Sequence, residues 1–308
     1  MKSAVVTGAS GFVGTHAVQK IASMGVKVYA LCGLGNRNND RISGVDNVSV
    51  IECDLLSSDM VWMSELPEHI DVIYHLAWTS TTGPFRTNMS SQMRNVVIAD
   101  NVSLLALAKS CKKIVVTGTV SEHLCTQIET ENQFHPIAFY LHTKRYIRNM
   151  FEQFSLQNAV TLVYCTFCHP IGYYNKTNQI FAKLAIDIMQ GEVCTFGPAN
   201  YFFDVIAVED LAHALYLCGV SSLKRQVYYV GSGNPQILKQ YIKQARDILN
   251  PDGELQFDGA VGATQPLQRE WLDCSEFCAE TGFVPKVDFE EAFNRTVNWV
   301  TEAMQSET

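Results

Sequence analysis

The sequence predicts an α/β fold, a doubly wound parallel sheet with a smaller, mainly helical C-terminal lobe. Three observations predict it. Short apolar runs alternate with helical patterns in the first half, a glycine-rich turn follows the first run, and the pattern loosens after about residue 167. Nearly continuous apolar runs are typical of parallel strands covered on both faces. Alternation with right-handed crossovers then gives a doubly wound sheet.

Each element follows from its own pattern. The predicted strands are Ala4–Thr7, Lys27–Leu31, Val48–Glu52, Val72–His75, Ile114–Thr117, Thr161–Cys165 and Val227–Val230. The predicted helices are Phe12–Met24, Asn95–Lys109, Tyr140–Phe154, Asn178–Gln190 and a terminal amphipathic helix with Phe289, Phe293, Val297, Val300 and Met304 on its apolar face. We therefore predict a cofactor-binding domain of residues 1–167 with 203–232, and a substrate lobe of residues 168–202 with 233–308.

Composition excludes several classes of protein. Of the 308 residues 47% are hydrophobic and 18% charged, and the formal net charge of −8 disfavours binding to nucleic acid. No run of 18 apolar residues predicts a membrane span. Residues 2–7 fit a core strand and not a signal peptide. The ten cysteines are scattered through apolar segments, so we expect reduced thiols and a cytoplasmic protein.

One cysteine cluster needs separate treatment. Cys165, Cys168 and His169 have the C-x-x-C-H spacing of haem attachment. They follow a predicted strand, where residues three apart point to opposite faces and cannot easily share a ligand. We therefore predict no haem or metal site.

A glycine-rich turn after the first predicted strand indicates a dinucleotide site. Gly8, Gly11 and Gly14 lie between that strand and a helix. We expect Gly8 to permit the turn, Gly11 to admit a pyrophosphate, and Gly14 to let the helix lie close to the strand. The helix N-terminus then faces the phosphates with free N–H groups. The predicted cofactor contacts here are Gly8, Ser10, Gly11, Phe12, Val13 and Gly14.

The end of the second predicted strand bears on the choice of cofactor. A carboxylate there accepts hydrogen bonds from the ribose hydroxyls of NAD, whereas a neutral or basic residue tolerates the 2′-phosphate of NADP. Cys32 stands there, and Arg37 and Arg41 follow, so the sequence favours NADP(H) over NAD(H). Further cofactor contacts are predicted at the ends of the next two strands, at Asp54, Leu55, Leu76 and Ala77, and His75 is predicted to be structural.

A tyrosine and a lysine one helical turn apart predict the chemistry. Tyr140 and Lys144 lie at i and i+4 on one helix face. An adjacent cation stabilises a phenolate, and the lysine can also hold the nicotinamide ribose. Thr119, at the end of the fifth strand, is predicted to bind the reacting oxygen, with Ser121 as the alternative. Tyr140 would then exchange a proton with a hydroxyl or carbonyl while a hydride moves.

With these residues in place, the chain resembles the extended short-chain dehydrogenase/reductases, in the group of nucleotide-sugar epimerases, dehydratases and 4-ketoreductases. The resemblance is carried by T-G-A-S-G-F-V-G at 7–14, Y-H-L-A at 74–77, Asn95 opening a long helix, T-G-T-V-S-E at 117–122, Y-L-H-T-K at 140–144, D-V-I-A-V-E-D-L-A at 204–212, Y-Y-V-G-S-G at 228–233 and T-G-F-V-P-K at 281–286. It implies a nucleoside diphosphate sugar in the small lobe and a homodimer that pairs the two long helices.

The departures from this family pattern are informative. The dehydratases carry Thr-Asp-Glu where Thr119 is followed by Val120 and Ser121, so elimination of water is not expected. A family arginine after the sixth strand is missing, and Phe203 replaces another just before Asp204. Arg269 either meets a phosphate or is an ordinary surface arginine.

Three functions follow from this pattern. The first is a 4-ketosugar reductase that consumes NADPH, and the second is a 4-epimerase that retains NAD. The third is a cofactor-sensing protein without catalysis, which the pair of Tyr140 and Lys144 disfavours. The sugar and the nucleotide are left open, and a non-sugar ketone or alcohol is not excluded.

Overall fold

The computed structural model of this chain describes residues 1–81, 84–131, 134–259 and 266–306. Its centre is a seven-stranded sheet in the order β3-β2-β1-β4-β5-β6-β11, in which every neighbouring pair is parallel. Its strands are β1 (Ser3–Thr7), β2 (Lys27–Cys32), β3 (Val48–Glu52), β4 (Val72–His75), β5 (Lys113–Thr117), β6 (Thr161–Thr166) and β11 (Val227–Tyr229). The strand order reverses between β1 and β4, and ligands of such sheets bind beyond the carboxyl ends of the strands at this point.

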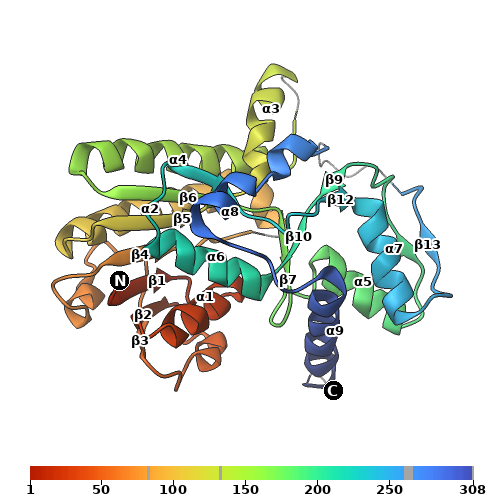
Figure 1. Cartoon of the computed structure of the whole chain (residues 1–308), viewed down its shortest axis with the longest axis horizontal. Coiled ribbons are helices and arrows are strands. Elements are labelled where there is room, and N and C mark those ends of the chain that lie inside the picture. Colours follow the sequence, from red (N-terminus) through yellow and green to blue (C-terminus); the bar gives the residue numbers. More distant parts are fainter. Residues whose placement is uncertain (82–83, 132–133, 260–265, 307–308) are drawn as a thin grey trace.

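Helices cover both faces of the sheet (Figure 1). On one face α1 (Phe12–Ser23) packs against α6 (Val208–Val220), and on the other α2 (Met89–Ala108) packs against α4 (Ala138–Asn158). The buried side chains divide accordingly into one core beneath α1 and α6 and another beneath α2 and α4. The predicted doubly wound sheet is confirmed.

A third core lies in the C-terminal lobe. This lobe is located beside the sheet (Figure 1). Its helices are α5 (Ile180–Met189), α7 (Leu238–Leu249) and α9 (Phe289–Ser306). Short strand pairs complete it: β7 (His169–Ile171) with β10 (Val205–Ala207), β9 (Phe202–Phe203) with β12 (Gln236–Ile237), and β8 (Cys194–Thr195) with β13 (Leu255–Gln256). The exact domain limits stay a prediction. Phe277 and Phe283, placed in the lobe by that prediction, pack in the core beneath α1 and α6.

The remaining elements are short. They are α3 (Cys125–Glu131), α8 (Ser275–Thr281) and the 3-10 helices η1 (Arg37–Arg41), η2 (Val61–Glu65), η3 (Pro84–Thr87), η4 (Val120–Leu124) and η5 (Arg269–Leu272).

The largest error among the predicted helix boundaries is at the start of α2. Asn95 does not open the second long helix, because α2 already begins at Met89. The Asn88 side chain caps that helix by accepting a hydrogen bond from the Ser91 N–H at 2.8 Å. Asn95 lies buried in the second turn instead, and its amide binds the backbone of Thr79, on the loop after β4.

The ten cysteines are all free thiols. Cys165 lies on β6 and His169 on β7, so the C-x-x-C-H segment spans two different strands. Within the described ranges, no group of three or more His, Cys, Asp or Glu side chains is placed to hold a metal. Nor does any helix in those ranges have the length and apolar character needed to cross a membrane.

Candidate active site

The glycine turn between β1 and α1 is shaped by excluded volume. Gly8 has a φ of +66°, and a Cβ on it would lie 2.8 Å from the Cα of Ala77. A Cβ on Gly14 would overlap the carbonyl oxygen of Gly8. Helix α1 therefore lies directly against the turn, and only glycine fits at either position.

The N-terminus of α1 fits an anionic group. Gly11 is its N-cap and provides no side-chain hydrogen bond, and the first turn holds no acidic residue. The first N–H groups of the helix and its partial positive charge are therefore available to a phosphate. The predicted contacts Phe12 and Val13 form this first turn, and Ser10 lies buried just before it.

The two arginines after β2 have different surroundings. Arg37 is exposed on η1. The Arg41 guanidinium carbon lies 4.3 Å from the ring centre of Tyr174 and 5.5 Å from that of Trp299. Arg41 thereby joins the sheet domain to α9, which leaves Arg37 as the arginine free to meet a cofactor.

A carboxylate does lie beside the end of β2, on the neighbouring strand β3. Glu52 ends β3 and pairs in register with Cys32 at the end of β2. It accepts from the Gly35 N–H at 3.2 Å and from Asn39 Nδ2 at 2.6 Å. The sequence pattern does not mark Glu52 as a site residue, because Glu52 reaches the end of β2 only through the pairing of β3 with β2. Cys32 itself is buried, and burial raises the pKa of its thiol.

The loops after β3 and β4 are tied to the sheet. Asn101 Nδ2 donates to the carbonyl of Leu55 at 2.8 Å, next to the exposed Asp54. The Thr7 hydroxyl accepts from the N–H groups of Leu76 and Ala77 at 3.2 and 3.1 Å. That hydroxyl donates to His75 Nδ1 at 2.9 Å. Burial lowers the pKa of His75 to about 3, so the ring is neutral.

The structure brings Thr119, Tyr140 and Lys144 together at the carboxyl end of β5. Tyr140 and Lys144 are buried on α4, and Lys144 Nζ donates to the Thr117 carbonyl at 2.9 Å. Burial raises the pKa of Tyr140, while Arg86 and a hydrogen bond with Thr119 lower it. Burial lowers the pKa of Lys144 to about 7, against the attraction of Glu122.

A buried glutamate supports this group from behind. Glu122 Oε1 accepts from the Thr119 N–H at 2.9 Å and from the Tyr164 hydroxyl at 2.7 Å. Its other oxygen, Oε2, is buried and has no hydrogen-bond partner within the part of the chain that is described. The ring of Tyr164 occupies the space that a Cβ on Gly118 would need. Glu122 therefore fixes the backbone of Thr119, and burial raises the pKa of the glutamate.

Two residues of the loop after β4 also belong to the site, and sequence analysis missed both. Lys144 Nζ lies 3.6 Å from the ring centre of Trp78, whose ring meets Tyr140 edge-on at 5.8 Å. The Arg86 guanidinium carbon lies 4.3 Å from the ring centre of Tyr140. Nothing in the local sequence pattern marks either residue, because only the packing of this loop on α4 places them here.

The two tentative substrate residues occupy neighbouring segments. Ser121 is half-buried, and its N–H donates to the Thr119 hydroxyl at 3.3 Å. Arg269 is exposed on η5, with its guanidinium carbon 5.8 Å from the ring centre of Phe202. Trp271 of η5 stacks on His123 of η4 at 4.9 Å, which holds η5 against the helix that carries Ser121.

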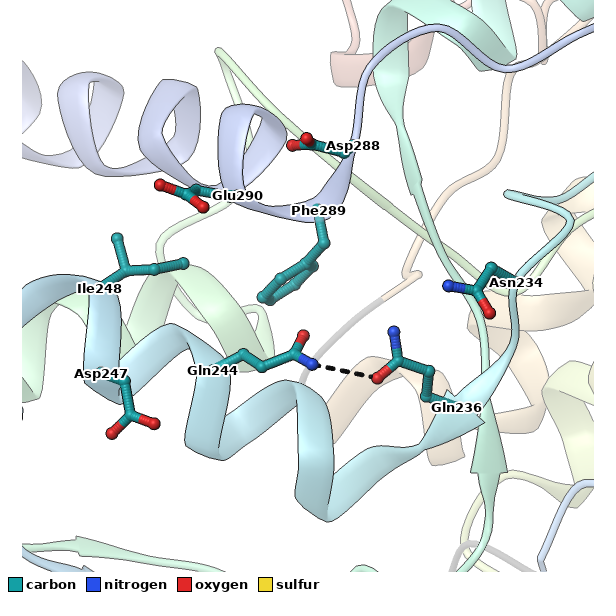
Figure 2. A pocket seen from close by; sticks show the side chains of 8 residues that line it. All are labelled: Asn234, Gln236, Gln244, Asp247, Ile248, Asp288, Phe289 and Glu290. Carbon is teal, nitrogen blue, oxygen red and sulfur yellow. Dashed lines mark hydrogen bonds between the residues drawn. The ribbon is translucent and has the colours of Figure 1, made fainter.

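A separate groove of about 550 Å³ lies between α7 and α9 in the C-terminal lobe (Figure 2). None of the predicted site residues lines it. Its lining consists of Asn234, Gln236, Gln244, Asp247, Ile248, Asp288, Phe289 and Glu290.

Residues 4–231 match the NAD dependent epimerase/dehydratase family. The chain belongs to this family. It is therefore an NAD(P)-dependent enzyme of the extended short-chain dehydrogenase/reductases, and the predicted resemblance is confirmed.

Several known proteins resemble the chain over most of its length. The dTDP-6-deoxy-L-talose 4-dehydrogenase (NAD(+)) of Aggregatibacter actinomycetemcomitans is 23% identical, covering 78% of this chain and 88% of that protein. The UDP-N-acetylglucosamine 4-epimerase of Methanobrevibacter ruminantium M1 superposes with a TM-score of 0.81 at 20% identity, covering 98% and 99% of the two chains. The UDP-glucuronic acid 4-epimerase of Bacillus cereus, in complex with UDP-glucuronic acid and NAD, has the same TM-score and coverage at 18% identity. These structural likenesses show the shared fold.

Proposed function

We propose that this enzyme transfers a hydride between NAD(P) and C4 of a nucleotide sugar. The observation that carries the proposal is the buried group of Thr119, Tyr140 and Lys144 beyond the carboxyl end of β5, at the edge that also holds the glycine turn. A buried phenol beside a buried ammonium is suited to move a proton at an alcohol or carbonyl. Proteins of similar structure act on nucleotide sugars at C4.

Each residue has a defined role in this proposal. The Tyr140 phenol exchanges a proton with the oxygen on the reacting carbon. Lys144 stabilises the phenolate by its charge, and the Thr119 hydroxyl orients the reacting oxygen. A bound nicotinamide supplies the hydride donor or acceptor at this edge. The N-terminus of α1, the exposed Arg37 and the loops at Asp54, Leu55, Leu76 and Ala77 would hold the cofactor.

The first candidate reaction is reduction of a 4-ketosugar. Val120 and Ser121 follow Thr119 on η4, so no acid and base pair is available there to eliminate water. The related dTDP-6-deoxy-L-talose 4-dehydrogenase (NAD(+)) is also named for a redox reaction at position 4 of a nucleotide sugar. Preference for NADP(H) over NAD(H) stays a prediction that rests on Cys32 and Arg37, while Glu52 on the neighbouring strand favours NAD(H).

The second candidate is a nucleotide-sugar 4-epimerase. Two solved structures that superpose on 98% of the chain are 4-epimerases. In an epimerase the same three residues remove and return one hydride, so no cofactor is consumed overall. A protein that only senses the cofactor would not need the pair of Tyr140 and Lys144.

Spectroscopy of the purified protein distinguishes these reactions. The reduced-nicotinamide band is followed after addition of nucleotide sugars and their 4-keto forms, with and without added cofactor. Stoichiometric loss of the band with a 4-keto sugar supports the reductase. Interconversion of two 4-epimers with retained cofactor and no net change in the band supports the epimerase. Absence of both reactions, with cofactor bound, would contradict the proposal.

We also propose a homodimer and a cytoplasmic location. Large apolar side chains of α2 remain 46–48% exposed in the single chain, namely Met93, Val97, Leu104 and Leu107. Tyr146 of the adjoining α4 is 53% exposed. Pairing of these two helices with those of a second copy would cover that face. Ten free thiols suit a reducing compartment.

A further inference from the structure

Among the described residues, Arg86 is a cation without a counter-charge beside Tyr140. Its guanidinium carbon lies 4.3 Å from the ring centre of Tyr140. Its Nε is buried and has no hydrogen-bond partner among the described residues, and no carboxylate in those ranges forms a salt bridge with it. A buried N–H group without a partner is costly, so this arrangement calls for an acceptor.

The other charges around Tyr140 are balanced. Lys144 and Glu122 attract one another across the site. Arg148 is paired with Glu152 at 2.9 Å. Arg86 is therefore left as an excess positive charge at the reaction centre, in a chain whose net charge is −8.

The loop that carries Arg86 also receives a second cation. Lys176, from the segment after β7, donates through Nζ to the Thr81 hydroxyl at 2.9 Å. The loop itself is held against α2, because Gln92 Nε2 donates to the carbonyls of Ser80 at 3.0 Å and Phe85 at 3.3 Å. These part-buried and exposed hydrogen bonds hold the backbone of the loop that carries Arg86.

We propose that Arg86 binds an anionic oxygen group of the substrate, either a carboxylate on the sugar or the diphosphate. This inference rests on the proposed function, since it assumes a nucleotide sugar whose C4 oxygen meets Tyr140. A guanidinium recognises carboxylate and phosphate oxygens through two parallel hydrogen bonds.

The position of Arg86 favours the carboxylate. In a hexuronic acid the carboxylate is attached to C5, the direct neighbour of C4, whereas the diphosphate is attached to C1 on the far side of the ring. A side chain that packs on the ring of Tyr140 therefore lies nearer to a C5 substituent than to C1. The structure thus assigns nucleotide-linked hexuronic acids as the favoured substrate class.

Calorimetry with matched ligands tests the assignment. Binding of UDP-glucuronic acid and UDP-glucose is measured on NAD-bound protein in the Tyr140→Phe background, which keeps the ring and prevents turnover. We expect UDP-glucuronic acid to bind at least ~10-fold more tightly, and Arg86→Gln to remove most of that advantage. Arg86→Lys should retain part of it, because the charge remains without the planar fork. Arg94→Gln, an exposed arginine of α2, is the matched control.

The outcomes separate the proposed role of Arg86 from the proposed function of the enzyme. A selective loss of UDP-glucuronic acid affinity in Arg86→Gln supports the carboxylate, and an equal loss for both ligands supports the diphosphate. Affinities that match those of Arg94→Gln for both ligands would overturn the role of Arg86 while leaving the proposed function intact. Binding of neither ligand to the parent protein, which still binds NAD, would overturn this inference, and the spectroscopic experiment above then decides the proposed function.

Discussion

The two halves of the sheet's carboxyl edge are built in different ways. Around β1 the site is made from backbone, because Gly8 and Gly14 leave no room for a Cβ and the N–H groups of α1 are uncovered. Around β5 it is made from buried side chains: burial shifts the pKa values of Lys144 and Glu122, and the charge of each opposes the shift of the other. The first half depends on the space left beside its glycines, and the second depends on the charges of its buried side chains. Substitutions should therefore act on folding and cofactor binding in one half, and on proton transfer in the other.

The largest effect is expected at the phenol. Tyr140→Phe keeps the ring that contacts Trp78 and Arg86 but removes the proton-transfer group. Turnover should fall by about 10²–10⁴-fold, the usual contribution of a positioned acid–base group. Cofactor affinity, measured by nicotinamide fluorescence, should stay within about twofold of the parent. Activity retained at the parental level would refute the role of Tyr140. Lost cofactor binding would show that the group around β5 also controls cofactor binding, contrary to the difference drawn between the two halves.

A substitution in the glycine turn tests the half of the site around β1, which is built from backbone. Gly14→Ala places a Cβ against the carbonyl of Gly8, so we expect a loss of about 1–3 kcal/mol in the free energy of unfolding. Cofactor affinity should fall with it. Gly33→Ala is the control, because a Cβ there meets no atom within 4 Å, and it should change stability by less than ~0.5 kcal/mol. Thermal or denaturant unfolding measures both, and equal effects would mean that volume does not specify this turn.

The same difference explains how far the sequence could predict the site. The glycine turn and the pair of Tyr140 and Lys144 depend on spacing along one segment, so the pattern predicts them. Trp78 and Arg86 reach Tyr140 only because their loop packs on α4. Glu52 is placed by the pairing of β2 with β3. Such contacts depend on tertiary packing, which hydrophobic periodicity does not encode. The predicted start of α2 is wrong because hydrophobic periodicity does not reveal the side-chain cap at Asn88.

Glu122 should control the pH dependence of activity. Glu122→Gln keeps an acceptor for the Thr119 N–H and the Tyr164 hydroxyl but removes a negative charge. Loss of that charge lowers the pKa of Lys144 below its value of about 7, and it also lowers the pKa of Tyr140. The limb of the pH profile where Lys144 loses its proton, near pH 7, should therefore move to lower pH.

Two measurements check this shift. One is the pH profile of kcat/KM, compared with that of Glu129→Gln, whose carboxylate is more than half exposed on α3. The other is the pH dependence of competitive acetylation at Lys144, read by mass spectrometry, which needs no substrate. A role of Glu122 in packing alone would lower activity at every pH without moving the limb set by Lys144.

The smallest effect is expected at the ribose end of the backbone-built half. Glu52 is exposed, and its carboxylate is directed into the loop after β2 by Gly35 and Asn39. Its charge should repel the 2′-phosphate of NADP through solvent, so Glu52→Gln should raise the affinity for NADP relative to NAD by about three- to tenfold. Fluorescence titration of both cofactors measures the ratio, with the exposed Glu68→Gln as control. Addition of salt should shrink the difference, because exposed charges are screened. A ratio that does not move would show that this carboxylate only shapes its loop, and would leave Arg37 and Cys32 to decide the cofactor.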